Sequence, residues 1–415
     1  MKLIVIGGGA AGYFAAIHHK AAYPTHEVLL MEKSENGLAK VKISGGGRCN
    51  VTHACFDARQ LADYYPRGGK ALIGPFQRFN PRDTMTWFQT RGVPLKIEPD
   101  GRVFPVSNAS QSIVDALENA AKQLGVTIWN RCAVDTIEPR PSGGFLITLS
   151  GGAVHPCDAI ILTTGSSRQG YSFAESLGHS IVPPVPSLFT FKINDPDLVA
   201  IPGVSVTSAT ATLHGAKTWK QTGPILVTHW GFSGPAIIKL SAWAARDFSE
   251  SSYQLPLTIH WLPAYKEQEI EATLMDLQSS SKKYISSKSL FPEISGRLWE
   301  YLVRKSIGNG DVQWIETGKK QMRKLIETLV RDRYQVVGKG VFKEEFVTCG
   351  GIPLNEVDFK TMESRVCPDL YFAGEILDID GITGGFNFQN AWTTGFIAGT
   401  SFDIEGYRPS TGKAS

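Results

Sequence analysis

Three glycines near the N-terminus have the spacing of a phosphate-binding loop. Gly7, Gly9 and Gly12 form a G-x-G-x-x-G pattern directly after the apolar run 3–6. In such a loop the first glycine allows a tight turn, the second lets a pyrophosphate reach the backbone, and the third lets a helix approach a strand. The helix that follows would offer free N–H groups and its positive dipole end to the phosphates. Glu32 follows at the distance where a carboxylate can bind ribose hydroxyls.

The residues around this loop have the expected pattern. Four aliphatic residues at 3–6 predict a buried strand, and the alanines and large apolar residues of 13–17 predict a helix packed on it. A second apolar run at 27–31 ends at Glu32. A glycine-rich turn without a ligand is the alternative. Strand, helix, second strand and acid in this order are typical of a dinucleotide-binding unit.

A second glycine run lies between Ser44 and Arg48. Three consecutive glycines exclude a regular element and allow the backbone to lie flat against a bulky group. Arg48 can face a phosphate or an electron-rich ring edge, and Asn50 can both donate and accept hydrogen bonds. The alternative is a flexible surface loop, but the small residues and Cys49 favour close packing.

A third glycine-rich stretch lies near the C-terminus. Residues 370–373 predict a buried strand, Gly374 and Glu375 follow it, and Gly384 and Gly385 open the last helix. The N-terminus of that helix would present N–H donors, which stabilise negative charge at N1 and O2 of a reduced flavin. A glycine-rich helix start without a ligand is the alternative.

The segments between these motifs predict an α/β domain. A helix is expected over 112–124 because its apolar residues follow helical spacing and Gly125 ends it. Strands are expected over 126–129, 133–138, 145–149 and 158–165, with an antiparallel pair around the turn at 141–144. This order is the layout of a dinucleotide domain with an inserted antiparallel sheet in its crossover.

A proline run at 183–186 marks a domain boundary. Short β-rich pieces follow to about residue 260, then a mostly helical stretch, and strand character returns over 334–342 and 345–349. The prediction is a dinucleotide domain of 1–186 and 337–415, an inserted β-rich domain of 187–264 and 334–336, and a helical cap of 265–333.

Composition narrows the class of protein. The 415 residues are 42% hydrophobic and 20% charged, with a net charge of +3, as expected for a soluble globular protein. The Lys/Arg-rich stretch 319–333 alternates with apolar residues, which favours the solvated face of a helix over a nucleic-acid patch. The six cysteines form no C-x-x-C pair and the histidines show no metal spacing. We expect no metal, no membrane span and no nucleic acid, and a reducing, cytoplasmic location.

The motifs together resemble one known family. Residues 42–50, which read K-I-S-G-G-G-R-C-N, are similar to the signature of the BaiN-like (HI0933-like) bacterial FAD-dependent oxidoreductases. Residues 186–189, 228–235 and 374–391 match that family in the same order. The resemblance implies a discontinuous glutathione-reductase-type Rossmann FAD domain, an inserted β-barrel-like domain and a helical cap. Its members are linked to reduction of steroid-type substrates and to amine oxidation. The loop after Gly165 is shorter here than in many relatives.

The residues expected at the FAD combine these motifs with the resemblance. In glutathione-reductase-type flavoproteins an acid at the position of Glu375 holds the ribityl hydroxyls. The full set is Gly7, Gly9, Ala10, Ala11, Gly12, Glu32, Lys33, Lys42, Gly46, Gly47, Arg48, Cys49, Asn50, Val134, Thr164, Gly165, Gly374, Glu375, Gly384, Gly385, Phe386, Asn387, Phe388 and Gln389.

The predicted activity is flavin-mediated hydride transfer to or from a small or medium organic substrate. Only one dinucleotide motif is present, since Gly338-Lys339-Gly340 lacks a third glycine, so NAD(P)H is expected only as a transient co-substrate. One alternative is an amine-type oxidase that uses oxygen. Another is a non-catalytic or RNA-directed flavin-binding protein, against which the low net charge speaks. No catalytic side chain is assigned. Packing is the favoured role for Cys49, and a structural role is at least as well supported for His229.

Overall fold

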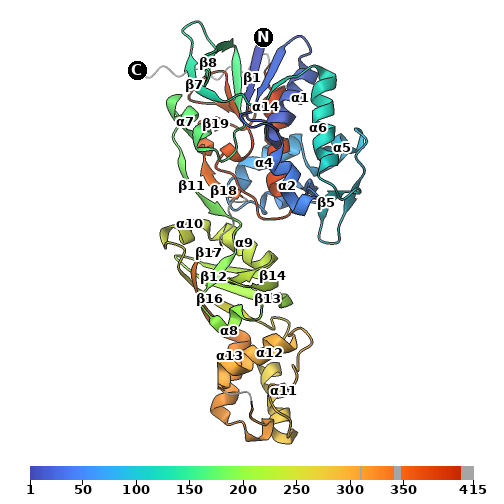
Figure 1. Cartoon of the computed structure of the whole chain (residues 1–415), viewed down its shortest axis with the longest axis vertical. Helices are drawn as coiled ribbons and strands as arrows, with labels where there is room; N and C mark the ends of the chain where they lie inside the picture. The colour runs from blue at the N-terminus through green and yellow to red at the C-terminus, as the bar shows by residue number, and fades with distance from the viewer. Residues whose placement is uncertain (309–310, 341–346, 403–415) are drawn as a thin grey trace. The chain divides into compact units, whose positions relative to one another are not determined.

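The computed structural model describes residues 1–308, 311–340 and 347–402. It divides into two compact units, one of Met1–Pro184 together with the chain from Val347 on, and one of Val185–Phe346. The first unit therefore contains both ends of the described chain, and the second is an insertion between them (Figure 1).

A seven-stranded sheet forms the centre of the first unit. Its strand order is β19-β20-β21-β10-β1-β2-β6. The parallel strands are β1 (Lys2–Ile6), β2 (Glu27–Met31), β6 (Thr127–Trp129), β10 (Ala159–Leu162) and β21 (Leu370–Phe372), and short β19 (Val357–Asp358) and β20 (Glu363–Ser364) run antiparallel at one edge. The central strands are buried on both faces, which explains their continuous aliphatic runs. The predicted Rossmann-type α/β class is confirmed.

Two helices from opposite ends of the sequence pack against each other in this unit. They are α1 (Ala10–Ala22) and α14 (Phe386–Thr400). A Cβ atom built on Gly395 would lie 2.8 Å from the Ala11 carbonyl oxygen, and one on Gly399 would lie 2.5 Å from that of Ala15. Only glycine allows so close an approach. The last helix begins at Phe386, because Gly385 is its N-cap and the aromatic and amide residues after it are already helical.

Smaller elements complete the first unit. α6 (Gln111–Leu124) ends at Gly125 with φ 81°, as predicted. The predicted crossover insert is a three-stranded sheet of β7 (Val134–Pro139), β8 (Phe145–Leu149) and β9 (Val154–Cys157). The remaining elements are α2 (Ala39–Gly47), β3 (Thr52–His53), α3 (Ala58–Ala62), α4 (Gly69–Arg78), α5 (Pro81–Gln89), β4 (Leu95–Ile97), β5 (Arg102–Pro105), α7 (Arg168–Ser176), β18 (Val347–Gly351), η2 (Leu354–Glu356) and η3 (Gly374–Ile376). The proline run at 183–186 falls in β11 (Val182–Ser187), where the chain leaves this unit.

The second unit contains a closed six-stranded barrel, which confirms the β-barrel-like insert. The strand order is β12 (Phe191–Ile193), β15 (Gly231–Ser233), β14 (Thr218–Thr228), β13 (Ser205–His214), β16 (Leu255–His260) and β17 (Asp332–Lys339). β13 is one continuous strand with a register shift between Val206 and Ala209 in its pairing with β14. Residues 337–339 continue the alternating pattern of β17, so they belong to the barrel rather than to the second segment of the dinucleotide domain. The predicted strand residues 341–346 lie outside the described part of the chain.

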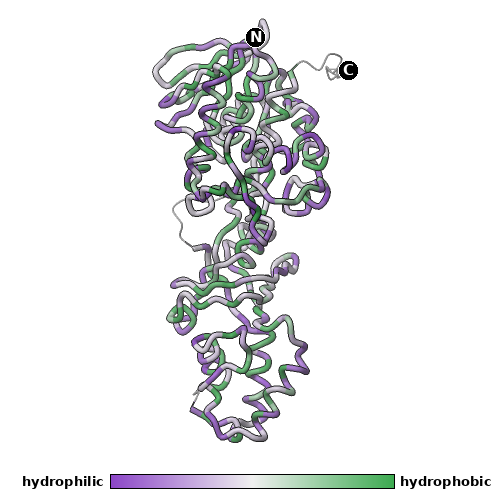
Figure 2. Tube along the Cα trace, turned by 90° about the vertical axis from the view of Figure 1, so that its right-hand side faces the viewer, coloured by the Kyte–Doolittle hydropathy of each residue, from purple (hydrophilic) through white to green (hydrophobic). Residues whose placement is uncertain are grey.

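Three helices form the cap beside the barrel, namely α11 (Glu267–Ser280), α12 (Gly296–Ile307) and α13 (Lys319–Arg331), with η1 (Trp314–Glu316) between the last two. Short helices α8 (Pro196–Val199), α9 (Pro235–Trp243) and α10 (Ala245–Glu250) flank the barrel strands. Barrel and cap share one hydrophobic core, in which Trp261, Trp299 and Leu329 are fully buried. Figure 2 shows hydrophobic stretches in the cap interior and hydrophilic ones on its outer turns.

A buried polar cluster joins the two halves of this core. The Asp332 carboxylate is 2% exposed and lies 2.7 Å from the Lys305 Nζ. It also accepts hydrogen bonds from the Trp261 indole at 3.0 Å and from the Tyr334 hydroxyl. Since these groups come from α12, β17 and the residue that follows β16, the cluster fixes the cap helix against the barrel.

Candidate flavin site

The first glycine loop lies between β1 and α1, and its three glycines differ in their surroundings. A Cβ on Gly7 (φ 108°) would lie 2.6 Å from the Thr163 carbonyl oxygen, and one on Gly12 would lie 2.0 Å from the Gly7 oxygen. No atom lies within 4 Å of the corresponding position on Gly9. Two of the glycines are therefore required by packing, and the third faces open space, where a pyrophosphate would fit. Ala10 and Ala11 form the first turn of α1, whose N-terminal N–H groups have no acceptor within the helix.

Glu32 lies beside this loop at the end of β2. One carboxylate oxygen accepts the Gly8 N–H at 2.7 Å, and the other accepts the Ser34 N–H at 2.8 Å. The carboxylate is thereby held next to the phosphate loop, as a ribose-binding acid requires. Lys33 is exposed to solvent.

The second glycine run interrupts α2. Helical geometry ends at Ser44, and Gly45, Gly46 and Gly47 have φ values of 57°, 67° and 83°. No atom lies within 4 Å of a Cβ built on Gly46 or Gly47. The run therefore presents bare backbone to an open space, as a ligand-facing segment does. Lys42 is exposed on the helical half of α2.

The three residues after this run have protein partners. The Arg48 guanidinium stacks 4.0 Å from the Phe104 ring centroid and pairs with Glu98 at 2.8 Å. The Cys49 side chain is completely buried, and burial raises the pKa of its thiol to about 12. It is therefore a neutral packing group. The Asn50 side-chain oxygen accepts the Gly385 N–H at 3.0 Å, and its nitrogen donates to the carbonyl oxygens of Thr52 and Val103 at 3.0 and 3.2 Å.

Glu375 is, after Glu32, the second acid that the sequence predicts at the FAD. Its carboxylate pairs with the Lys40 Nζ at 2.7 Å and accepts the Thr348 N–H at 3.1 Å. A Cβ on Gly165 would lie 3.4 Å from the same carboxylate, and one on Gly374 (φ 80°) would lie 2.8 Å from the Ala11 Cβ. The strand ends of β10 and β21 and the start of α1 thus meet here. Sequence reasoning missed Lys40, and the only signal in the sequence is a lysine four residues before the break in α2 at Ser44.

The side chains at the start of α14 contact neighbouring parts of the protein and hold in place the loop that precedes this helix. The Phe386 ring stacks 4.4 Å from Tyr64, at 11° between the planes, and 4.7 Å from His53. The Asn387 amide clasps Gly381, donating to its carbonyl oxygen and accepting its N–H, both at 2.8 Å. These contacts fix the helix N-terminus that Gly384 and Gly385 open.

Three further residues that were predicted to lie at the FAD have partners within the protein. Gln389 is fully buried, where its oxygen accepts the hydroxyls of Thr52 and Thr84 at 2.6 and 2.9 Å. Phe388 stacks on Trp392 with ring centroids 5.7 Å apart, and the Val134 carbonyl oxygen accepts the Gln169 side chain at 2.6 Å. The Thr164 hydroxyl oxygen is buried and has no hydrogen-bond partner in the described part of the chain. His229 is exposed in the turn between β14 and β15.

These observations fit FAD. The Cβ positions of Gly9, Gly46 and Gly47 face open space, and Glu32 and Glu375 are the two carboxylates predicted for the hydroxyl-bearing parts of FAD. Within the described residues, no group of three or more His, Cys, Asp or Glu could hold a metal ion, and no helix has the length and hydropathy to cross a membrane.

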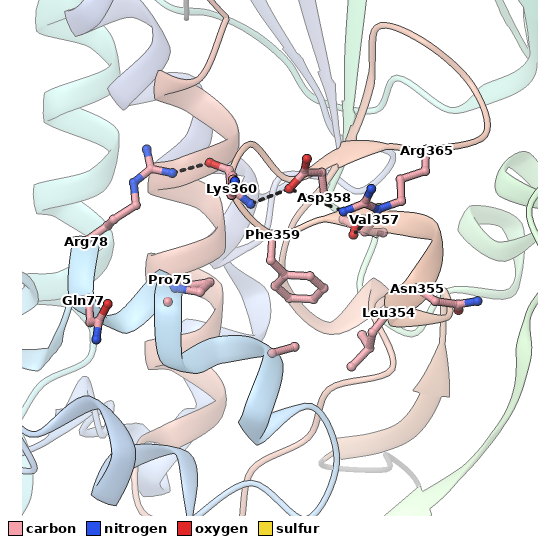
Figure 3. Close-up of a pocket in the computed structure, with 12 residues that line it drawn as sticks. Pro75, Gln77, Arg78, Leu354, Asn355, Val357, Asp358, Phe359, Lys360 and Arg365 are labelled. Atoms are coloured by element: carbon pink, nitrogen blue, oxygen red, sulfur yellow. Dashed lines mark hydrogen bonds and ion pairs between the residues drawn. The ribbon is translucent and has the colours of Figure 1, made fainter. Parts of the chain in front are cut away.

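A cavity of about 690 Å³ lies elsewhere in the first unit, between α4 and the 354–365 segment. Figure 3 shows the Phe359 ring between α4 and Leu354, with Arg78 donating to the Lys360 carbonyl oxygen. None of the predicted cofactor residues lines this cavity.

Comparison with known proteins identifies the family of this chain. A model of the HI0933-like protein Rossmann domain matches residues 1–401. A 3-dehydro-bile acid delta(4,6)-reductase of Clostridium scindens is 28% identical over 412 residues, covering 96% of this chain and 98% of that protein. A ribosomal RNA dihydrouridine synthase of Escherichia coli is 29% identical over 404 residues, covering 94% and 95%. The structure of a 3-ketosteroid delta1-dehydrogenase from Sterolibacterium denitrificans shares the fold at 12% identity, with a TM-score of 0.51 and coverage of 96% and 98%. The chain therefore belongs to the HI0933-like family of FAD-dependent oxidoreductases.

Proposed function

We propose that this protein reduces a carbon–carbon double bond conjugated with a carbonyl group. In this proposal FAD is the bound cofactor, and NAD(P)H binds transiently to reduce it. The observation that carries the proposal is the pattern of glycines in the first unit. Gly7, Gly12 and Gly385 are blocked by neighbouring backbone, whereas Gly9, Gly46 and Gly47 open onto free space.

The names of the two relatives support the same reaction class. Reduction of a 3-dehydro-bile acid at delta(4,6) and formation of dihydrouridine both add hydrogen across a double bond conjugated with a carbonyl. In such a reaction a hydride goes to the carbon β to the carbonyl and a proton goes to the α carbon. FAD, when bound and reduced, supplies the hydride.

The chain's own residues would bind and orient the cofactor. We propose that Gly9 and the first turn of α1 hold the pyrophosphate, that Glu32 holds the adenosine ribose, and that Glu375 holds the ribityl chain. Lys40 would orient the Glu375 carboxylate through their 2.7 Å ion pair. Lys33, Lys42, Val134, Thr164 and Gly165 remain predicted neighbours.

The start of α14 would stabilise charge on the reduced ring. Its free N–H groups and positive dipole end favour an anion there. The stack of Phe386 on Tyr64 and the clasp of Asn387 on Gly381 hold this helix end rigidly. Since Cys49 keeps its proton, it does not act as a thiolate relay.

An anaerobic experiment tests the reaction class. The purified holoprotein should lose its flavin absorption when NADPH or NADH is added, and a 4-en-3-one steroid or a uridine-containing RNA should restore it, with one reduced double bond per flavin. The oxidase alternative predicts the reverse, namely bleaching by amines and rapid recovery in oxygen. Bleaching by amines alone would overturn the proposal.

A further inference from the structure

The cavity between α4 and the 354–365 segment takes no part in the proposed reaction. Its volume of about 690 Å³ lies within the range of about 300–1,000 Å³ that small-molecule sites occupy. Both of its walls belong to the first unit, and none of the predicted cofactor residues lines them. A ligand bound here would therefore occupy a site separate from the predicted FAD residues.

One wall of this cavity is apolar. Pro75 and Val357 are buried there, whereas Leu354 and the Phe359 ring are only partly covered by the protein. Figure 3 shows the Phe359 ring standing between α4 and Leu354. A ligand with an apolar body would cover these partly exposed surfaces, and removing them from water favours binding.

The rest of the lining carries an excess of positive charge. Arg78, Lys360 and Arg365 line the cavity together with one acid, Asp358. The Asp358 carboxylate is 7% exposed, accepts the Lys360 N–H at 2.9 Å and lies 3.7 Å from the Arg365 guanidinium. The Arg365 Nε also donates to the Val357 carbonyl oxygen at 3.2 Å. Three cations and one carboxylate leave a net charge of +2 around the cavity, and Asp358 is already engaged with Arg365.

Arg78 has no acidic partner within residues 1–308, 311–340 and 347–402. Its guanidinium donates to the Lys360 carbonyl oxygen, which orients the side chain beside the cavity without neutralising its charge (Figure 3). Partial burial lowers the pKa of this guanidinium. A bound anion would replace the hydration that the cation loses, and arginine can bind a carboxylate through two parallel hydrogen bonds.

We propose that this cavity binds an amphipathic organic anion, whose apolar body lies on Phe359 and Leu354 and whose carboxylate pairs with Arg78. A neutral apolar ligand would leave the Arg78 charge without a counterion, and an inorganic anion would leave the Phe359 ring in contact with water. The two kinds of wall together therefore select molecules that carry both features. This inference is independent of the proposed function, because no residue assigned there to FAD lines the cavity.

Isothermal titration calorimetry of the FAD-loaded protein tests this site with a matched pair of probes. 1-Naphthylacetate carries an aromatic body and a carboxylate, and 1-naphthylacetamide carries the same body without the charge. We expect the wild type to bind the carboxylate at least about fivefold more tightly, since hydrogen bonds to a charged group are stronger than those to a neutral one. Raising the salt concentration from about 0.05 M to about 0.5 M should narrow this difference by screening the charges.

Two variants separate the charge from the apolar wall. Arg78→Gln should weaken binding of the carboxylate about fivefold or more and leave binding of the carboxamide unchanged. Its matched control is Arg59→Gln, which changes an exposed arginine of α3 outside the cavity and should bind both probes like the wild type. Ala71→Leu should weaken binding of both probes, because Ala71 lines the cavity and the larger side chain would fill part of it. Leucine is a good helix former, so this variant should melt at about the wild-type temperature.

Three results would overturn the inference. The wild type could bind neither probe or both equally, Arg78→Gln and Arg59→Gln could lose the same affinity, or Ala71→Leu could fold normally and bind both probes like the wild type. A probe that shifts the flavin absorption band equally in the wild type and in Ala71→Leu binds at the cofactor, which also contradicts this site. Loss of the carboxylate preference in Arg78→Gln alone, with both probes weakened in a folded Ala71→Leu, supports the inference.

Discussion

Gly9 and Gly12 offer a matched pair of substitutions that tests the cofactor site directly. Gly9 has φ −87° and ψ −170°, which alanine adopts without strain, and its Cβ would meet no atom within 4 Å. Alanine is a poorer N-cap than glycine but lowers the entropy of the unfolded chain, so these opposite effects should leave apo-protein stability within about 1 kcal/mol. The added methyl group would occupy the space reserved for the pyrophosphate. Loss of one charge-assisted hydrogen bond, about 1.5–3 kcal/mol, weakens FAD binding about 10- to 150-fold.

The same change at Gly12 should act on the fold. Its Cβ would lie 2.0 Å from the Gly7 carbonyl oxygen and 2.7 Å from the Thr163 hydroxyl, so β1 and α1 must separate. Such overpacking costs about 1–3 kcal/mol, which lowers the Tm of a domain of this size by about 2–12 °C. Thermal melts of the apo-proteins and fluorescence titration with FAD measure both effects. If Gly9→Ala binds FAD as tightly as the wild type, or melts as early as Gly12→Ala, the assignment of roles in this loop is wrong.

Three further substitutions test other parts of the structure. Asp332→Asn leaves Lys305 without its buried partner and should lower the free energy of unfolding by about 3–5 kcal/mol in urea, while adding Lys305→Met should recover part of the loss. Burial lowers the pKa of His19 to about 4, so as the pH falls the imidazole is protonated in the unfolded chain before it is protonated in the folded protein. The free energy of unfolding should therefore fall by up to about 3 kcal/mol between about pH 6.5 and about pH 4. His19→Gln should flatten this pH dependence of unfolding. Gln389→Leu should lower the Tm by leaving the Thr52 and Thr84 hydroxyls without their acceptor, yet FAD titration of the folded protein should give the wild-type Kd; a large loss of affinity would place Gln389 at the cofactor instead.

The glycine motifs and the central sheet could be predicted because their constraints are local. Aliphatic runs bounded by glycine define buried strands, and the spacing of Gly7, Gly9 and Gly12 follows from the turn itself. The helix ending at Gly125 was predicted for the same reason, since a residue with φ 81° favours glycine.

The roles of individual side chains could not be predicted because they depend on partners distant in sequence. Arg48 stays a predicted neighbour of the ligand, but its partners Glu98 and Phe104 of the β4–β5 hairpin could not be foreseen from the sequence. Gln389 lies in the motif that resembles the family signature, yet its partners Thr52 and Thr84 come from the other end of the chain. Lys40 was missed because its partner Glu375 is 335 residues away.

The absence of nucleic acid was expected from the low total charge and from the lack of a long basic run along the sequence, and it stays a prediction. Neither observation says how charge is distributed over the folded surface. The bridge between Tyr284 and Gln313 gathers lysines from two separate segments, and no count along the sequence shows such a cluster.

The central sheet contains strands from both ends of the described chain, and this has a consequence during synthesis. β21 pairs with β10 only after residues 185–346 have left the ribosome. At roughly 5–20 residues per second, those 162 residues take about 8 to 32 s to translate. During that interval the edge of β10 that pairs with β21 is unpaired in the nascent cofactor domain. The barrel and the cap are encoded by one continuous segment, so they can fold first. Flavin loading is therefore expected only after β21 has been synthesised.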